Sequence, residues 1–526
     1  MQGGLRLFIK LKGITNETIA KIKSELTALQ SREVDREALS LDSRMALSSL
    51  RQCALDNQTN ETADMVISAF SPDNTLDPGK AAFALLVDLG IFHKHEDLNL
   101  LRLEIRADFP EEVLTEAAGI EEQLAGRFQD RERLSGVRLL AIDDSDTDEV
   151  DDAIGVEVTP TGYRVHVVIC DVATAIPVGG PIDNEAADRA TTVYHPTGRF
   201  LMLPHELSTD LLSLKEGSER LVLDHIFSVD NQGQVFDFTV KPRVATLSRR
   251  LNYEETDAIL SGKPDKDQDV LQNLWRIAEF LFNERIRFGA VHFYPHEVKV
   301  MADPATSTVT FKQIDTFSPA RRLISEYMVA CGGAIGRMLA EQMVPAVYRR
   351  QSPPSEPIEW DEESARDARF ILDNVRKLKR AEISLKPDRH NALGLMAYTQ
   401  VTSPLRRYSD LLMQRQLHSF LVRRVPAYSD GDLLARMTVA EQTSIQVKRA
   451  INDADRYWAM VALQERIGER VPALLLDTRR RHSLVKLMDY GLTARYLPNR
   501  PLDDGIFVNL KVVQVDPRAD RLTLID

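Results

Sequence analysis

Residues 141–154 read AIDDSDTDEVDDAI, and this stretch decides how the middle of the chain folds. Aliphatic residues on both sides predict two strands, one ending at Ile142 and one beginning at Ala153, joined by an acidic loop. Carboxylates this close repel one another beside a packed sheet, and hard oxygen ligands suit Mg²⁺ or Mn²⁺. The loop is therefore predicted to hold a divalent metal. Seven of the ten residues from 143 to 152 are acidic: Asp143, Asp144, Asp146, Asp148, Glu149, Asp151 and Asp152.

Two other interpretations compete for this loop. A calcium-binding EF-hand loop is excluded because Glu149 stands where the turn glycine belongs and Gly155 stands in place of the bidentate glutamate at the twelfth position. Strands, not helices, are also predicted on both sides. A simply solvated acidic loop stays open on this segment alone.

A second segment, VTSPLRRYSDLL at residues 401–412, supplies positive charge. Pro404 predicts the first residue of a helix, which puts Arg406 and Arg407 in its opening turn, where guanidinium groups and a helix amino terminus can bind phosphate. Residues 366–424 hold 13 Lys/Arg against 5 Asp/Glu, although the whole chain has a net charge of −13. An Arg-Arg pair at a helix start is by itself usually surface charge. An acidic site together with a basic one is what a metal-dependent enzyme needs to act on a polyanion.

The 526 residues are too many for one ordinary domain. Residues 1–105 predict helices and one strand candidate at 98–105, as in a winged helix-turn-helix RNA-binding domain; a helical cap packing on the next domain is an equal alternative. Residues 106–462 predict a large α+β catalytic domain. The predicted fold class is therefore multidomain α+β.

The last part of the chain, residues 463–526, predicts five short strands, the pattern of an OB-fold barrel. Its cations and rings suit single-stranded RNA, although a solvated arginine turn is the alternative. The predicted RNA-binding cations are Arg479, Arg480, Arg481 and Lys486.

Composition limits the cellular setting. The three cysteines Cys53, Cys170 and Cys331 are too far apart for a disulfide framework or a zinc site. No apolar run is long enough for a membrane span, and the first residues have no signal-peptide pattern. We expect a cytoplasmic monomer without a membrane partner.

The acidic and arginine segments together resemble the ribonuclease II family of RNB-domain exoribonucleases. The likeness runs from about residue 137 to residue 458. Four further stretches carry it: TTVYHPTGRFLMLPHELSTDLLSLKEGSERL at 191–221, GAVHFYPHEVKV at 289–300, LISEYMVACGGAIGRMLAE at 323–341, and HNALGLMAYTQVTSPLRRYSD at 390–410.

The resemblance implies a processive 3′→5′ exoribonuclease that hydrolyses single-stranded RNA to nucleoside 5′-monophosphates with Mg²⁺, or with Mn²⁺. By the same resemblance Arg406 would steady the scissile phosphate with Arg407 close by, and Tyr194 would stack on the 3′-terminal nucleotides. Phe293 would be the opposing clamp and Tyr253 a further aromatic contact; core packing is the alternative for each ring. The implied metal ligands are Asp143, Glu149, Asp151 and Asp152.

Three departures from the family pattern stand out. Glu149 replaces the usual Asp, and Ile451 stands where a late helix often has Glu, so that Asp453 or Asp455 would have to take over its role. The predicted helices of residues 1–105 replace cold-shock barrels, which leads us to expect tolerance of structured RNA. The departures at Glu149 and Ile451 keep one alternative open, a catalytically impaired RNA-binding or regulatory protein of the same fold.

Overall fold

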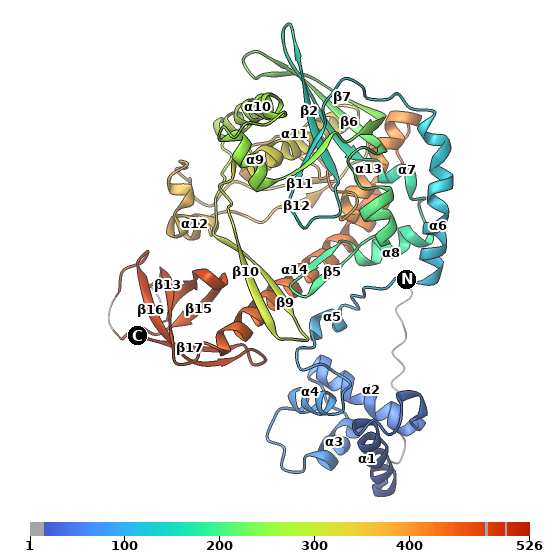
Figure 1. The fold of residues 1–526 in the computed structure, drawn as a ribbon, viewed down its shortest axis with the longest axis vertical. Helices are drawn as coiled ribbons and strands as arrows, with labels where there is room; N and C mark the ends of the chain where they lie inside the picture. The colour runs from blue at the N-terminus through green and yellow to red at the C-terminus, as the bar shows by residue number, and fades with distance from the viewer. Residues whose placement is uncertain (1–14, 479–481, 500–501) are drawn as a thin grey trace. The chain divides into compact units, whose positions relative to one another are not determined.

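The computed structural model describes residues 15–478, 482–499 and 502–526, so Arg479, Arg480 and Arg481 lie outside the described residues. The chain divides after Arg106 into two compact units, each described here by itself (Figure 1). The predicted boundaries of the RNB and OB-fold domains stay predictions. No helix in the described ranges is long and apolar enough to cross a membrane.

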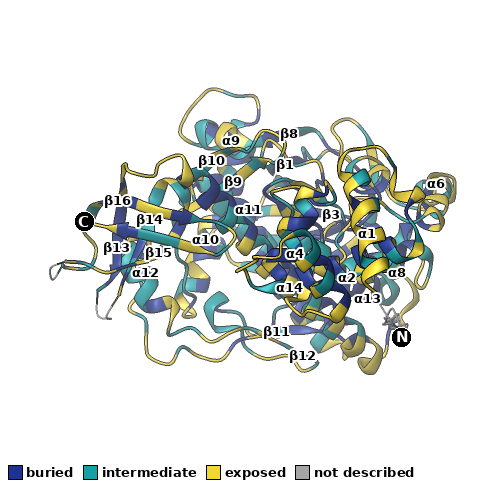
Figure 2. Ribbon diagram, turned by 90° about the horizontal axis from the view of Figure 1, so that it is seen from below, coloured by how far each residue is buried: buried dark blue, intermediate teal, exposed yellow. Residues whose placement is uncertain are grey.

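The first unit is helical, as predicted. Side chains of Thr15, Ser40, Asn60 and Asp77 cap the amino termini of its four longer helices. α1 buries only Ile22 and Leu26, and most of its surface is exposed or half-buried (Figure 2). The helices are α1 (Asn16–Gln30), η1 (Arg36–Ala38), α2 (Leu41–Asp56), α3 (Glu61–Phe70), α4 (Pro78–Asp88) and α5 (Leu98–Arg102).

The strand predicted at residues 98–105 is wrong. The Asp97 side chain accepts hydrogen bonds from the backbone N–H groups of Asn99 and Leu100, and this cap starts the short helix α5. Residues 15–106 therefore contain helices and turns but no strand, and the strand that a wing would need is not among them.

A six-stranded sheet forms the centre of the second unit, in the order β7-β6-β3-β2-β1-β8. β1 pairs antiparallel with β2 and parallel with β8. The two predicted strands on either side of the acidic loop are thus adjacent. Asp143 at the end of β1 and Asp152 at the start of β2 therefore lie at the same end of the two strands. The strands are β1 (Leu140–Asp143), β2 (Asp152–Thr159), β3 (Gly162–Cys170), β6 (Glu219–Asp230), β7 (Val235–Thr246) and β8 (Arg249–Asn252).

Helices cover both faces of this sheet (Figure 1). Alternate side chains enter two cores, because successive residues of a strand point to opposite faces: Ile142 packs in one core and Ala141 in the other. The first core contains α9 (Tyr253–Leu260), α10 (Gln268–Arg287) and much of α11 (Pro319–Glu341). The second contains α6 (Glu111–Ala125), α7 (Val172–Ala175), α8 (Pro181–Arg189), α13 (Tyr408–Arg423) and the start of α14 (Asp430–Gln464).

Three two-stranded ribbons and several short helices account for the remaining elements of the second unit before α14. The ribbons are β4 (Val193–His195) with β5 (Gly198–Phe200), β9 (Glu297–Asp303) with β10 (Thr308–Ile314), and β11 (Tyr348–Arg350) with β12 (Glu382–Ser384). The short helices are η2 (Gly126–Phe128), η3 (Glu206–Leu211), η4 (Ser364–Arg366), α12 (Ala368–Val375) and η5 (Asn391–Leu393).

The five strands predicted near the carboxyl end form one nearly closed antiparallel sheet in the order β15-β14-β13-β16-β17, with the short helix η6 (Met488–Tyr490). In β14 and β15 every second side chain is buried, as in the wall of a barrel. The predicted multidomain α+β class with a terminal barrel is confirmed. The strands are β13 (Arg470–Asp477), β14 (Ser483–Leu487), β15 (Leu492–Tyr496), β16 (Phe507–Asp516) and β17 (Arg521–Ile525).

Candidate active site

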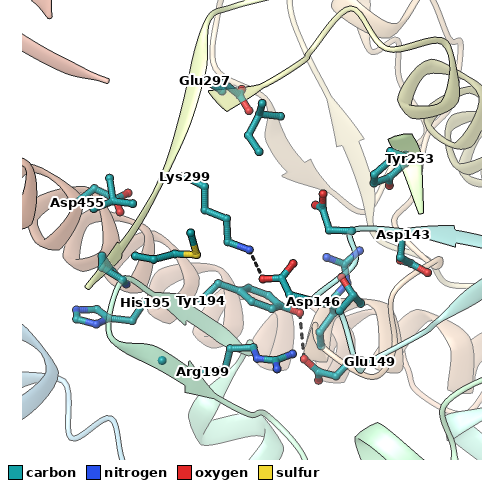
Figure 3. Close-up of a pocket in the computed structure, with 18 of the residues that line it drawn as sticks. Asp143, Asp146, Glu149, Tyr194, His195, Arg199, Tyr253, Glu297, Lys299 and Asp455 are labelled. Carbon is teal, nitrogen blue, oxygen red and sulfur yellow. Dashed lines mark hydrogen bonds and ion pairs between the residues drawn. The ribbon is translucent and has the colours of Figure 1, made fainter. Parts of the chain in front are cut away.

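The acidic loop between β1 and β2 lines a cavity of about 540 Å³, which we call the carboxylate chamber (Figure 3). Residues of β4, β5, β9, β10, α9, α11 and α14 and of the turn before α13 line the rest of it. The chamber contains all four predicted metal ligands together with Arg406, Tyr194 and Tyr253. Residues that are far apart in sequence therefore meet where the sequence predicted chemistry.

The seven acids divide into two groups. Three of them pair with cations: Asp144 with Arg321 at 2.6 Å, Asp146 with Lys299 at 2.5 Å, and Asp148 with Arg199 at 2.6 Å. The remaining four, Asp143, Glu149, Asp151 and Asp152, have a single ion pair among them in the described part of the chain, from Asp151 to Arg406 at 3.1 Å. Negative charge is thus left uncompensated inside the chamber.

Asp151 is buried, and both of its oxygens accept hydrogen bonds. Its Oδ1 accepts a hydrogen bond from the Leu405 backbone N–H at 2.9 Å and a weak one from the Cys170 thiol at 3.8 Å, and its Oδ2 accepts from Arg406 Nε. These contacts attach the turn before α13 to the acidic loop. They also hold Arg406, whose side chain stays 44% exposed, at the chamber wall.

Glu149 is buried and reaches β4. Its Oε1 accepts a hydrogen bond from Thr192 Oγ1 and its Oε2 accepts one from the Tyr194 hydroxyl, both at 3.0 Å (Figure 3). The glutamate that departs from the family pattern is thus tied to the tyrosine predicted to stack on RNA.

Burial raises the pKa of every inner carboxyl group. The pKa is raised to about 6 for Asp143 and Asp151 and to about 7 for Glu149, and for Asp152 it is raised well above the usual range by burial and by its acidic neighbours. Asp455, also in the chamber, has its pKa raised to about 6 by burial. A divalent cation would offset this repulsion.

The donor set fits such a cation chemically. Asp143 and Asp152 accept no side-chain hydrogen bond from any residue in the described ranges, so their oxygens are available as ligands. As the side chains stand, no three acidic, histidine or cysteine groups among residues 15–478, 482–499 and 502–526 form a ready metal site. Asp151 and Glu149 are instead bonded to Arg406 and Tyr194.

Some predicted residues lie elsewhere. Phe293 packs edge-on against Phe370, with ring centroids 6.3 Å apart, and does not line the chamber. Lys486 donates a hydrogen bond to the His296 carbonyl at 2.6 Å. Tyr253 does line the chamber, and the Arg321 guanidinium lies 4.0 Å from the centre of its ring.

The prediction that Arg406 and Arg407 open a helix is wrong, because α13 begins at Tyr408. The carbonyl of Arg406 accepts two hydrogen bonds from the segment before β4. The donors are the Thr192 backbone N–H at 3.0 Å and the Thr191 hydroxyl at 2.9 Å, so this carbonyl is not free to join a helix. The backbone is extended at Arg407, and the side chains of Arg406 and Arg407 point into different cavities. Arg407 pairs with Asp410 at 2.7 Å, outside the chamber.

Sequence reasoning missed the cations that pair with Asp144, Asp146 and Asp148. Arg199, Lys299 and Arg321 come from three separate segments, and no local pattern marks them as partners of the loop. Ile451 lines a different cavity, whereas Asp455, one of the two suggested substitutes, lies in the chamber.

Comparison with known proteins decides the family. The RNB domain profile matches residues 131–423, more than half of the chain. The chain belongs to the RNB domain family. The resemblance to ribonuclease II found in the sequence is thereby confirmed, and the four inner acids and Arg406 all lie within the matched RNB region.

Similar RNB proteins extend the likeness. An uncharacterized ribonuclease of Synechocystis sp. is 31% identical over 450 residues, 83% of this chain and 66% of the relative. The chain spans about half to two thirds of the length of the curated relatives it matches.

Solved structures share the fold at lower identity. The Dss1 exoribonuclease of Candida glabrata has a TM-score of 0.75 at 19% identity, covering 96% of this chain and 69% of that one. The Mycoplasma genitalium RNase R in complex with double-stranded RNA has a TM-score of 0.71 at 20% identity, covering 81% of this chain and 82% of that one.

The raised pKa values predict how stability depends on pH. Ordinary carboxyls titrate near pH 4, so between about pH 4 and 7 the chamber carboxyls bind more protons in the native chain than in the unfolded chain. Their contribution to the free energy of unfolding therefore falls as pH rises. We expect Asp152→Asn to raise the melting temperature in EDTA at pH 8 by about 2–5 °C, because it removes repulsion and breaks no hydrogen bond. Thermal melts followed by circular dichroism measure this.

At pH 5 the gain should shrink, because Asp143 and Asp151, with pKa values of about 6, and Glu149, with a pKa of about 7, are then mostly protonated and repel Asp152 less. Asp148→Asn is the control, since Asp148 lies outside the chamber and is exposed. An equal gain for Asp152→Asn at both pH values would contradict the assignment of repulsion to this residue.

Proposed function

We propose that this chain is a processive 3′→5′ exoribonuclease that hydrolyses single-stranded RNA to nucleoside 5′-monophosphates with Mg²⁺, or with Mn²⁺. One observation carries the proposal: two buried and two half-buried carboxylates with one arginine counter-ion line a chamber beside a half-exposed tyrosine. Membership of the RNB family and the ribonuclease names of relatives support the same reaction.

Asp143, Asp152 and Asp151 would hold the divalent ions, with Glu149 beside them. Bound there, the metal would lower the pKa of a water molecule and stabilise charge on the phosphate. Arg406 can meet the phosphate itself, because its Nε faces Asp151 while part of the guanidinium stays exposed in the chamber. A fixed cation next to the phosphate oxygens stabilises the charge that develops there.

Binding without base recognition follows from the aromatic residues. Tyr194 is 41% exposed and is held by Glu149, and Tyr253 lines the same chamber. Every base has a face that can stack, so stacking on these rings is independent of sequence. The uncompensated acids repel the RNA phosphates, and either a bound cation or the replacement of one acid by a neutral side chain would relieve that repulsion. Cleavage would need the metal itself.

The first test uses a 5′-labelled single-stranded RNA of about 30 nucleotides, with Mg²⁺ or with EDTA. We expect shortening from the 3′ end to a short limit product with Mg²⁺ and no reaction in EDTA. Asp152→Asn should lower the rate by roughly 10²- to 10³-fold, as the loss of one electrostatic contact to a transition state does, while RNA binding persists. Asp151→Asn should do the same but also weaken the Arg406 contact.

Asp148→Asn is the matched control, and its rate should stay close to the wild type. RNA that is bound but never shortened, even with Mn²⁺, would contradict the proposal and favour the impaired RNA-binding protein. Asp152→Asn that loses binding and cleavage together would remove Asp152 from the metal site.

Tyr194 is proposed to set the length of the last product. Tyr194→Ala should leave a limit product longer by one or more nucleotides with a modest loss of rate, because the stacking surface is gone. Tyr194→Phe keeps the ring and loses only the hydrogen bond to Glu149, so it should keep the wild-type length. Gel analysis of limit products measures this, and an unchanged product from Tyr194→Ala would assign Tyr194 to packing.

We also propose tolerance of structured RNA. Residues 15–106 are helical, so this region has none of the strands of a cold-shock barrel. A hairpin with a single-stranded 3′ extension should be degraded through its stem. An unstructured RNA of the same composition is the control substrate. Digestion that stops several nucleotides before every stem would refute this.

A further inference from the structure

A second cavity, of about 500 Å³, lies next to the carboxylate chamber. We call it the basic pocket; its charged side chains are Arg349, Arg380, Arg407, Lys448 and Glu441. Thr191 and Arg407, which form an isolated antiparallel bridge, lie in its wall. Since the backbone of Arg407 is extended, Arg406 faces the chamber and Arg407 faces the basic pocket.

The basic pocket has more cations than counter-ions. Arg349 donates to Glu441 at 2.8 Å and to Gln400 at 3.0 Å, so its charge is matched. Arg407 pairs with the buried Asp410. Arg380 and Lys448 are exposed and form no ion pair with any residue in the described ranges. Two positive charges are left for an anion from solution.

Two buried polar atoms at the basic pocket also have no partner among the described residues. They are Nε of Arg407 and Nδ1 of His390, a half-buried residue whose ring packs edge-on against Tyr398. Buried polar atoms in proteins nearly always have a hydrogen-bond partner. As the side chains stand neither atom is accessible, so each could meet a ligand only after its side chain turns toward the pocket.

The remaining wall is apolar. Ile445, Val447 and Ile451 of α14 line one part of it, and the Tyr398 ring lines another. The volume of about 500 Å³ falls inside the range of roughly 300–1,000 Å³ typical of small-molecule sites. A flat base fits an apolar and aromatic wall, and a phosphate fits the cations.

We propose that the basic pocket binds a nucleoside 5′-monophosphate, with its phosphate at Arg380, Arg407 and Lys448 and its base against Tyr398 and α14. A phosphate monoester carries a charge near −2 at neutral pH, which matches the two unpaired cations better than the single charge of a phosphodiester. The proposal rests on the proposed function for the source of the ligand, because the proposed reaction releases such a nucleotide.

The test measures binding to the full chain in EDTA, so that no RNA hydrolysis is involved. Isothermal titration calorimetry with UMP should give one site, inorganic phosphate should bind more weakly, and uridine should not bind. Lys448→Ala and Arg380→Ala should each weaken UMP binding about fivefold, because each removes one charge-assisted contact. Lys448→Glu, which reverses the charge, should weaken it further.

Arg449→Ala is the matched control. Arg449 is the next residue on α14, equally exposed, and is not part of the basic pocket. No UMP binding at millimolar concentration, or the same loss in Arg449→Ala, would overturn the proposal. So would UMP binding that Arg406→Ala abolishes and Lys448→Ala leaves unchanged, because the nucleotide would then be in the carboxylate chamber.

A competition experiment with a short single-stranded RNA distinguishes a site for a free mononucleotide from a site for a nucleotide within an RNA chain. If a trinucleotide competes with UMP and its own binding falls equally in Lys448→Ala, the pocket belongs to the RNA chain and the mononucleotide site is refuted. Weak competition by the trinucleotide supports the proposal. If the protein binds UMP but does not degrade RNA, the result contradicts the proposed function and leaves the proposed nucleotide site standing.

Discussion

The ion pair between Asp151 and Arg406 is the contact on which the candidate site depends. It joins residues 255 positions apart, at a carboxylate that is almost completely buried. A buried carboxylate without a partner is strongly destabilising, so the turn before α13 and the acidic loop must lie together. The same contact keeps a guanidinium in the chamber where phosphate chemistry would need it.

The electrostatics of the loop follow from how its acids are divided. Asp144, Asp146 and Asp148 pair with cations from α11, β9 and β5, respectively, and are thereby neutralised. The inner acids face a cavity, and burial there raises their pKa values because the charged forms lose solvation. One run of sequence therefore supplies both the ion pairs that hold the loop and the unneutralised charge that calls for a divalent cation.

The departures from the family pattern have different structural consequences. The longer side chain of Glu149 accepts hydrogen bonds from Thr192 and Tyr194, so it links the metal site to the stacking residue. Ile451 lies in the basic pocket, where an acidic residue would have cancelled part of the positive charge. Asp455 faces the carboxylate chamber, one turn further along α14.

Sequence alone determined the parts of this protein that rest on local pattern. The aliphatic runs on both sides of the acidic loop predicted β1 and β2, and the crowded acids predicted a cation site, because both depend on neighbours in the chain. Local pattern failed where a distant contact decided the outcome. Arg406 lies outside the helix because its carbonyl bonds to Thr191 and Thr192, and Phe293 packs on Phe370. The failure at residues 98–102 is of another kind, because there a local cap from Asp97 starts a helix that the apolar run did not indicate. Only the tertiary structure decided which acids are paired and that Arg406 and Arg407 face different cavities. The reason is that burial and long-range ion pairs arise only when separate segments meet.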